Sequence, residues 1–247
     1  MRKLLPTTPP LKRISRKAID ILSALAVTVT VISLFAVTYL TNTQDEQTVD
    51  VSSYAIYKGN AENGAAGMMF NVYEGSDIIM EILSILQSYS VKSTFFIGGV
   101  WAEKNADTLL AIAENGHEIG CHGYLHKDHA TLSLEQNKEE IVKTNRLIKE
   151  ITGKNVTLFA PPSGSFGKNT EDACRALGQK MILWTKDTID WRDNDPSLLI
   201  KRATKNPTSG DLVLMHPKKQ TLSALPTIIE TYLDKGISLN TVSEVIK

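Results

Sequence analysis

The chain is 247 residues long, and its 27 basic and 27 acidic side chains give it no formal net charge. This balance argues against a nucleic-acid partner, because proteins that bind nucleic acids usually carry a basic face. Hydrophobic residues make up 42% of the chain, which is enough for a buried core. The two cysteines, Cys121 and Cys174, could form one disulfide, but we expect two free thiols near the core.

The N-terminal part of the chain is expected to hold it in a membrane. Residues 1–20 form a basic segment, predicted to be cytoplasmic, and residues 21–40 form an uncharged, mostly apolar run. Twenty helical residues span about 30 Å, the thickness of the hydrocarbon core of a bilayer. The positive-inside rule therefore predicts a single-pass protein of the cell membrane, with everything after the anchor outside the cytoplasm. A cleaved signal peptide is the alternative, but its apolar core would usually be shorter.

The rest of the chain is predicted to be a linker followed by one domain. Residues 41–63 are polar and without strong periodicity, apart from one short strand around residues 54–57, and residues 64–247 fit a single domain. Within the domain, short apolar runs alternate with stretches of helical spacing. Strands are expected at residues 68–70, 94–97, 118–121, 156–159, 181–184, 212–215 and 237–239, and helices at 77–87, 106–114, 133–151, 170–177, 196–204, 222–233 and after residue 241.

This alternation predicts an α/β fold with a parallel sheet of about seven strands and helices outside it. No glycine-rich phosphate loop follows the first strand, so a distorted (β/α) barrel, closed or nearly closed, is favoured over an open sheet. In such barrels the functional residues follow the carboxyl ends of the strands.

Polar residues follow most of the predicted strands. His122 and His126 come after the third strand, and their spacing would allow both imidazoles to bind one divalent metal ion. Asn71, Val72 and Glu74 follow the first strand, and Ala160 and Pro161 follow the fourth. Asp187, Asp190 and Trp191 follow the fifth strand, and Leu214 and His216 lie around the end of the sixth. We therefore expect these residues to meet on one rim of the barrel.

The order of these residues resembles the motifs of the polysaccharide deacetylase family, carbohydrate esterase family 4, whose shared unit is the NodB-like domain. The resemblance runs from about residue 66 to residue 247. The second family motif is present as His122 and His126, and the fourth as Asp187, Asp190 and Trp191. The fifth motif is present as Leu214 and His216.

The resemblance implies metal-assisted hydrolysis of an N-acetyl amide on a sugar. The metal, often zinc, would be held by His122 and His126 together with an aspartate. His216 would protonate the leaving amine while Asp190 holds it, and the substrate pocket would be lined by Trp191, Leu214, Pro161 and Asp187. The implied partner is an N-acetylated glycan of the cell wall or cell surface, peptidoglycan or a chitin-like polymer.

The first and third motifs depart from the family pattern. Asn71 stands where the family has its catalytic base, Val72 where it has the metal-binding aspartate, and Ala160 where an arginine pairs with the base. An amide cannot accept a proton at neutral pH, and valine has no ligand atom. Glu74 could act as a substitute base or ligand, although a solvated loop carboxylate is the simpler interpretation.

Two main hypotheses about function are therefore consistent with the sequence. The first is an active deacetylase in which Glu74, Asp128 or Asp187 supplies the missing carboxylate. The second is a catalytically inactive glycan-binding or scaffold protein that keeps the pocket. A third interpretation, a fold used only for protein contacts, predicts no sugar binding.

The remaining residues that could take part in catalysis or binding have simpler interpretations. His117 is expected to be structural and His129 to be exposed. Trp101 and Trp184 are expected to be packing residues. Ser163 and Ser165 have no evident basic partner, so neither is expected to be a nucleophile.

Overall fold

The computed structural model describes residues 16–17, 25–33 and 54–247. It divides into two units, Met1–Ser52 and Ser53–Lys247. In the first unit, residues 25–33 are helical. None of the helices within these three described ranges is both long and apolar enough to cross a membrane. Most of the predicted anchor at residues 21–40 and of the segments beside it lies outside the described residues, so the anchor stays a prediction.

The second unit is built on a parallel sheet of nine strands, in the order β1-β6-β5-β4-β3-β2-β8-β7, with β9 paired to β2. Every strand pair is parallel, which confirms the predicted α/β class. No pairing in residues 54–247 joins β7 to β1, so the sheet curls like a half-barrel without closing. The strands are β1 (Ala55–Ile56), β2 (Ala65–Val72), β3 (Thr94–Ile97), β4 (Glu118–Cys121), β5 (Leu158–Phe159), β6 (Lys180–Ile182), β7 (Lys186–Asp187), β8 (Leu212–Met215) and β9 (Ser238–Asn240).

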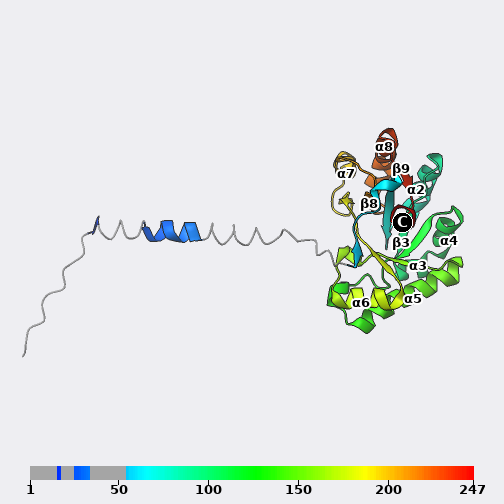
Figure 1. The fold of residues 1–247 in the computed structure, drawn as a ribbon, viewed down its shortest axis with the longest axis horizontal. Coiled ribbons are helices and arrows are strands. Elements are labelled where there is room, and N and C mark those ends of the chain that lie inside the picture. The colour runs from blue at the N-terminus through cyan, green and yellow to red at the C-terminus, as the bar shows by residue number, and fades with distance from the viewer. Residues whose placement is uncertain (1–15, 18–24, 34–53) are drawn as a thin grey trace, which may run out of the picture. The chain divides into compact units, whose positions relative to one another are not determined.

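Helices surround this sheet, with α5 beside α6 on one side and α7 beside α8 on another (Figure 1). The α-helices of the second unit are α2 (Ser76–Ser88), α3 (Gly99–Lys104), α4 (Ala106–Glu114), α5 (Leu134–Thr152), α6 (Lys168–Leu177), α7 (Pro196–Ala203), α8 (Lys219–Asp234) and α9 (Val242–Val245). Three short 3-10 helices lie in connections: η2 (Ala61–Asn63), η3 (His129–Thr131) and η4 (Pro162–Gly164). Strand β1 confirms the short strand expected around residues 54–57, and η2 lies in the same segment, which the sequence assigned to the linker.

Local sequence signals explain where the long helix α5 begins and ends. Ser133 Oγ accepts a hydrogen bond from the Gln136 N–H at 3.2 Å, and Gln136 Oε1 accepts one from the Ser133 N–H at 3.0 Å. These two bonds form a reciprocal capping box, and the helix begins where the sequence predicted it to begin. Gly153 ends the helix with a φ of 71°, a conformation that costs glycine little.

The core has two parts, one on each face of the sheet. The outer part lies between the sheet and the helices, and the inner part fills the curl of the sheet. Along β2, Met68, Phe70 and Val72 belong to the outer part, whereas Met69 belongs to the inner part. This alternation follows from the two-residue period of a strand.

Both cysteines are free and buried, as predicted. Burial raises the pKa of Cys121 and of Cys174 to about 12. The two thiols are therefore unreactive packing groups at neutral pH.

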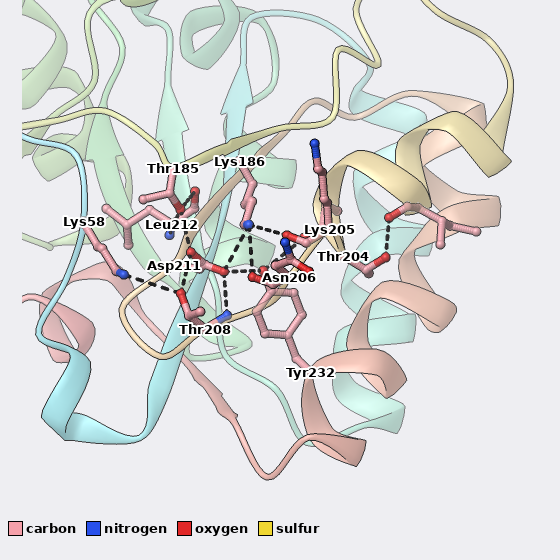
Figure 2. A network of polar contacts seen from close by, with 12 residues as sticks. Lys58, Thr185, Lys186, Thr204, Lys205, Asn206, Thr208, Asp211, Leu212 and Tyr232 are labelled. Carbon is pink, nitrogen blue, oxygen red and sulfur yellow. Dashed lines mark hydrogen bonds and ion pairs between the residues drawn. The ribbon is translucent and has the colours of Figure 1, made fainter.

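A polar network ties the amino-terminal end of β8 to its surroundings (Figure 2). The buried Asp211 accepts hydrogen bonds from the Thr208 N–H at 2.9 Å and from Tyr232 Oη at 3.0 Å. It also accepts one from Thr185 Oγ1 at 3.1 Å. Lys186 Nζ lies 3.8 Å from the carboxylate. These contacts fix one end of β8 while its other end carries the residues of the candidate site.

Candidate functional site

A cavity of about 410 Å³ opens at the carboxyl ends of the strands. We call it the central pocket. It lies where parallel α/β folds place their functional residues. Its lining comes from the ends of β2, β7 and β8 and from the connections after β2, β4, β5, β6, β7 and β8. It consists of Asn71, Tyr73, Glu74, His122, His126, Ser163, Trp184, Asp187, Trp191, Leu214, His216 and Lys218.

The two histidines of the second motif lie together in this pocket. The ring centroids of His122 and His126 are 5.1 Å apart. His122 Nδ1 lies 2.8 Å from the carbonyl oxygen of Ala160 and, because a carbonyl only accepts, must carry the hydrogen. The other ring nitrogen of His122 is thereby left as an acceptor or ligand. Burial lowers the pKa of both histidines, that of His122 well below its usual value, so both are neutral at neutral pH.

A buried carboxylate shapes the loop between these histidines. Glu140, on α5, accepts hydrogen bonds from the N–H groups of Tyr124 at 2.8 Å and Leu125 at 2.7 Å. The loop turns sharply, with a φ of 73° at Gly123 and 53° at His126. A positive φ at a residue other than glycine is sparsely populated and persists only where surrounding contacts hold it. Glu140 supplies such contacts.

His216 and Asp190 form a buried pair. His216 Nδ1 lies 2.7 Å from Asp190 Oδ1, and the His216 N–H donates to Asp190 Oδ2 at 2.6 Å. Thr221 Oγ1 also donates to Asp190 Oδ2, at 2.7 Å. The carboxylate thereby fixes the imidazole and leaves its second nitrogen for contact with a ligand.

The end of β2 places Asn71 and Tyr73 in the pocket but not Val72. Asn71 is 2% exposed, lines the pocket, and its Oδ1 has no hydrogen-bond partner. Val72 is fully buried in the outer core. The Tyr73 ring packs against the histidines, with its centroid 4.1 Å from that of His126 and 6.3 Å from that of His122.

The donor set does not fit the metal ion that the resemblance implies. A zinc site needs at least three protein ligands, and His122 and His126 are two. Within residues 54–247 and the two short N-terminal ranges, no three side chains of His, Cys, Asp or Glu are grouped so that they could hold a metal. The ring of Tyr73 lies against both histidines on the side of β2, from which a third ligand would come.

The three carboxylates considered as substitute bases lie in different surroundings. Glu74 lines the central pocket but forms an ion pair with Lys218. Asp187 also lines the pocket; burial raises its pKa, and its Oδ1 accepts the Ile189 N–H at 2.8 Å. Asp128 is not in the lining; its Oδ1 accepts a hydrogen bond from Ser165 Oγ.

Some other expectations from the sequence need correction. His129, expected to be exposed, is completely buried, and its Nδ1 lies 2.7 Å from Asn137 Oδ1. Pro161, expected in the substrate pocket, is not among the residues that line it, whereas Ser163 is. His117 is buried just before the start of β4, and its Nδ1 accepts the Ser93 N–H, which confirms the structural role expected for it.

The sequence analysis did not assign four of the lining residues to the site: Tyr73, Ser163, Trp184 and Lys218. A signal for Tyr73 was available, because the strand alternation that places Asn71 in the pocket places the residue two positions later on the same face. Trp184 was assigned to packing, although it follows β6 at the same rim as the other lining residues. No pattern in the sequence pointed to Lys218.

Comparison with known proteins agrees with this geometry. The polysaccharide deacetylase family matches residues 58–182. The chain is 39% identical over 191 residues to the uncharacterized protein YlxY of Bacillus subtilis, covering 77% of this chain and 60% of YlxY. It is 27% identical to the peptidoglycan-N-acetylglucosamine deacetylase PgdA of Listeria monocytogenes, covering 74% of this chain but only 39% of PgdA. The chain thus spans less than two thirds of both relatives.

A solved structure is similar over most of the domain. BA3943 of Bacillus anthracis, a pseudoenzyme of carbohydrate esterase family 4, superimposes with a TM-score of 0.77 at 35% identity, covering 80% of this chain and 70% of that one. A mutant of BA3943, 33% identical to this chain, is described as having restored enzymatic activity. With the family match over half of the sequence and the similar fold, the chain belongs to the polysaccharide deacetylase family.

Proposed function

We propose that this domain binds an N-acetylated glycan in the central pocket without hydrolysing it. The observation that carries this proposal is the replacement of the acidic residues of the first family motif at the end of β2. Asn71 and the ring of Tyr73 occupy the pocket there. The aromatic and polar groups that could recognise a sugar are otherwise present, including the half-exposed Trp191. An indole face packs well against the apolar face of a sugar ring.

The unpartnered Asn71 Oδ1 supports an acetamido ligand. A buried acceptor without a donor costs about 1–3 kcal/mol. The N–H of an acetamido group would supply that donor and would bring no charge next to the two neutral histidines.

The relatives favour peptidoglycan as the glycan, since PgdA is named for peptidoglycan N-acetylglucosamine. A chitin-like polymer carries the same acetamido sugar and serves as the alternative ligand. Our proposal also places the domain outside the cytoplasm at the cell membrane, because the predicted anchor would hold it there. Protease treatment of intact cells tests this location: a domain outside the membrane is digested, and one inside is protected.

Hydrolysis is a second candidate, favoured by Asp187. Its carboxyl group lines the same pocket as His216, and burial raises its pKa, which makes it a better base. Glu74 is less suited to this role because Lys218 pairs with it.

One experiment separates these functions. The full chain is titrated calorimetrically with tetramers of N-acetylglucosamine and of glucosamine, and with peptidoglycan fragments, while acetate release is measured in parallel with added zinc or cobalt. We expect the acetylated ligands to bind more tightly and no acetate to appear. Acetate release that disappears in Asp187→Asn would establish hydrolysis instead.

A substitution of Asn71 tests the acetamido contact itself. Asn71→Leu has a similar volume but no acceptor, so it should weaken binding of the acetylated tetramer by about tenfold. Asn155→Leu, at an exposed asparagine outside the pocket, is the matched control and should leave the affinity unchanged. Equal binding of acetylated and free-amine tetramers would contradict the proposal.

A further inference from the structure

A second cavity lies at the amino ends of the strands, opposite the end that carries the central pocket. It has a volume of about 390 Å³, and we call it the basal cavity. Its walls come from the second half of α5, the end of α6 and the residues just before β5 and β6 (Figure 1). It shares no lining residue with the central pocket. Cavities of about 300 Å³ or more are large enough for a small molecule.

One lining residue of the basal cavity has a buried acceptor without a partner. Gln179 is 4% exposed, and its Nε2 donates to the Val156 carbonyl oxygen at 3.0 Å. Because a carbonyl oxygen only accepts, this bond fixes which end of the side-chain amide is the nitrogen. Gln179 Oε1 is therefore an acceptor, and within the part of the chain that the structure describes it has no hydrogen-bond partner.

A second unpartnered acceptor comes from α5. Asn145 also lines the basal cavity, and its Oδ1 is buried and has no hydrogen-bond partner among the described residues. Most buried polar atoms in proteins are hydrogen-bonded, so two acceptors without partners in the lining of one cavity are unusual. Both would be satisfied by a ligand that brings N–H or O–H donors.

Two cations give the basal cavity a preference for a negatively charged ligand. Arg146 and Lys149 belong to its lining and occupy exposed positions of α5. Arg146 Nε lies 3.5 Å from Glu150 Oε1, but both side chains of this pair are mostly exposed, and such pairs are weak. Lys149 has no ion-pair partner among the described residues. Both cations are therefore available to an anion.

The rest of the lining adds apolar surface and narrows the class of ligand. Val142, which is 48% exposed, and the half-buried Leu177 lie in the same walls. An inorganic anion would pair with the cations but has no N–H donor, and a neutral sugar has donors but no charge. The carboxyl end of a peptide has backbone N–H donors, side chains for apolar contact and a carboxylate.

We propose that the basal cavity is a binding site for a short peptide that ends in a free carboxylate. The backbone N–H groups of the peptide donate to Asn145 Oδ1 and Gln179 Oε1. Its carboxylate pairs with Arg146 and Lys149. This site does not depend on glycan binding in the central pocket, so the domain has two separate sites at opposite ends of its sheet.

Nuclear magnetic resonance on the isotope-labelled full chain tests the site, because it detects weak binding. The probe is acetyl-Ala-Ala with a free carboxyl group, for which we expect a Kd of about 1 mM. Saturable shifts should appear at the backbone and side-chain amides of Asn145 and Gln179. The same peptide with an amidated carboxyl group should bind about tenfold more weakly, because charge-assisted hydrogen bonds are lost.

A double substitution tests the two cations. Arg146→Gln combined with Lys149→Gln should remove the preference for the free carboxylate, so that both peptides bind equally weakly. Lys201→Gln combined with Lys205→Gln makes the same change in net charge at exposed positions on and after α7, and should keep the preference.

A single substitution tests one of the two acceptors. Asn145→Leu has a similar volume but no acceptor, and should weaken both peptides by about fivefold. The spectrum of each variant without peptide shows that it is folded.

The outcomes are distinct. Equal affinity of the unaltered chain for the two peptides, or peptide binding without shifts at Gln179, overturns the proposal. Inorganic phosphate that binds as tightly as acetyl-Ala-Ala and shifts the same amides would show a simple anion site instead. Asn71→Leu, which tests the glycan contact, should leave peptide binding unchanged, so that this proposal and the proposed function can fail separately.

Discussion

Tyr73 and Val72 show how one strand position decides what a pocket can hold. Counting along the first family motif assigns the metal-binding position to Val72. The structure buries Val72 completely in the outer core and directs Tyr73 to the two histidines. Tyr73 therefore lies beside the two histidines, where a third ligand would be needed, because alternate residues of a strand face opposite sides.

This placement predicts that Tyr73→Asp creates a metal site. The carboxylate would replace the aromatic ring beside His122 and His126 and complete three protein ligands. Calorimetry at pH 7 should show one zinc ion bound per chain in the variant, with an affinity at least about a hundredfold above that of the wild type. His122→Ala in the same background is the control and should abolish binding.

Val72→Asp should behave differently from Tyr73→Asp. A charge buried among apolar side chains has no partner, so we expect a loss of about 3 kcal/mol or more in the free energy of unfolding. Urea unfolding measures this loss. If Val72→Asp were as stable as the wild type and bound zinc, the assignment of the third-ligand position to Tyr73 would be wrong.

His117 predicts a pH dependence of stability. Burial, and to a lesser extent Lys92, lower its pKa to about 4. The imidazole of His117 thus stays neutral in the folded state at pH values where, below about 6.5, it is protonated in the unfolded state. Its contribution to stability is complete above pH 6.5 and is lost as the pH falls towards 4, by up to about 3 kcal/mol.

The comparison with His117→Asn isolates this contribution. Asparagine can still accept the Ser93 N–H through its side-chain oxygen but does not titrate. The free energy of unfolding, measured in urea from pH 4.5 to 8, should fall less steeply with decreasing pH in the variant. Parallel curves would show that His117 is not the cause.

At the scale of elements, helix α5 holds the loop that carries the two histidines. The contacts run from one buried side chain, Glu140, to two backbone N–H groups of the loop. Helix and loop are joined by charge-assisted hydrogen bonds, which are stronger than neutral ones. The loop is thereby fixed relative to the sheet.

Glu140→Gln should loosen this connection. The amide keeps an acceptor but lacks the charge, so we expect a loss of about 1–2 kcal/mol in the free energy of unfolding. Hydrogen exchange should also become faster at Tyr124 and Leu125. Glu139→Gln, at the exposed neighbouring position, is the matched control. Unchanged exchange at both amides would contradict a holding role for Glu140.

Most elements of the domain could be predicted, because their boundaries carry strong local signals. Helix α5 has its capping box and Gly153, and β3 and β4 are short apolar runs with the observed bounds. The elements that were missed are short: β7 has two residues, and α3 has six and begins at a glycine. Pairing with β8 stabilises β7, and such tertiary contacts are not visible in local sequence.

The candidate site could be predicted to a similar degree, and the errors in its prediction have a similar cause. His122, His126, Asp190 and His216 were identified from spacing and resemblance. The fold brings the three histidines to one pocket and places Asp190 behind His216. Pro161 and Trp184 were misplaced, and Lys218 was missed, because the residues that line a pocket depend on the path of the loops, which periodicity does not describe. His129 was misjudged because its burial depends on a contact with Asn137, eight residues away on the next helix.

At the scale of the whole molecule, the compact unit begins before the family motifs do. Strand β1 pairs with β6, and Tyr54 Oη donates to the Gln179 carbonyl oxygen at 2.6 Å. The Leu183 N–H donates to the Ile56 carbonyl oxygen at 2.8 Å. Residues 54–56 therefore support the fold although they precede the first catalytic-type motif.

Removing this segment should weaken the domain. A chain that starts at residue 59 lacks β1 and should be less stable than one that starts at residue 53, by about 2–4 kcal/mol for the lost hydrogen bonds and buried surface. Urea unfolding of the two chains measures the difference. Coincident unfolding curves would show that β1 contributes nothing to stability.

The open sheet has a consequence for how the protein behaves in concentrated solution. The strands at the two ends of its order, β1 and β7, are each two residues long, and β9, which pairs only with β2, has three. Long bare strand edges recruit strands from other molecules, and very short ones offer few free N–H and C=O groups for such pairing. The half-barrel can therefore leave its sheet unclosed without presenting a template for edge-to-edge aggregation.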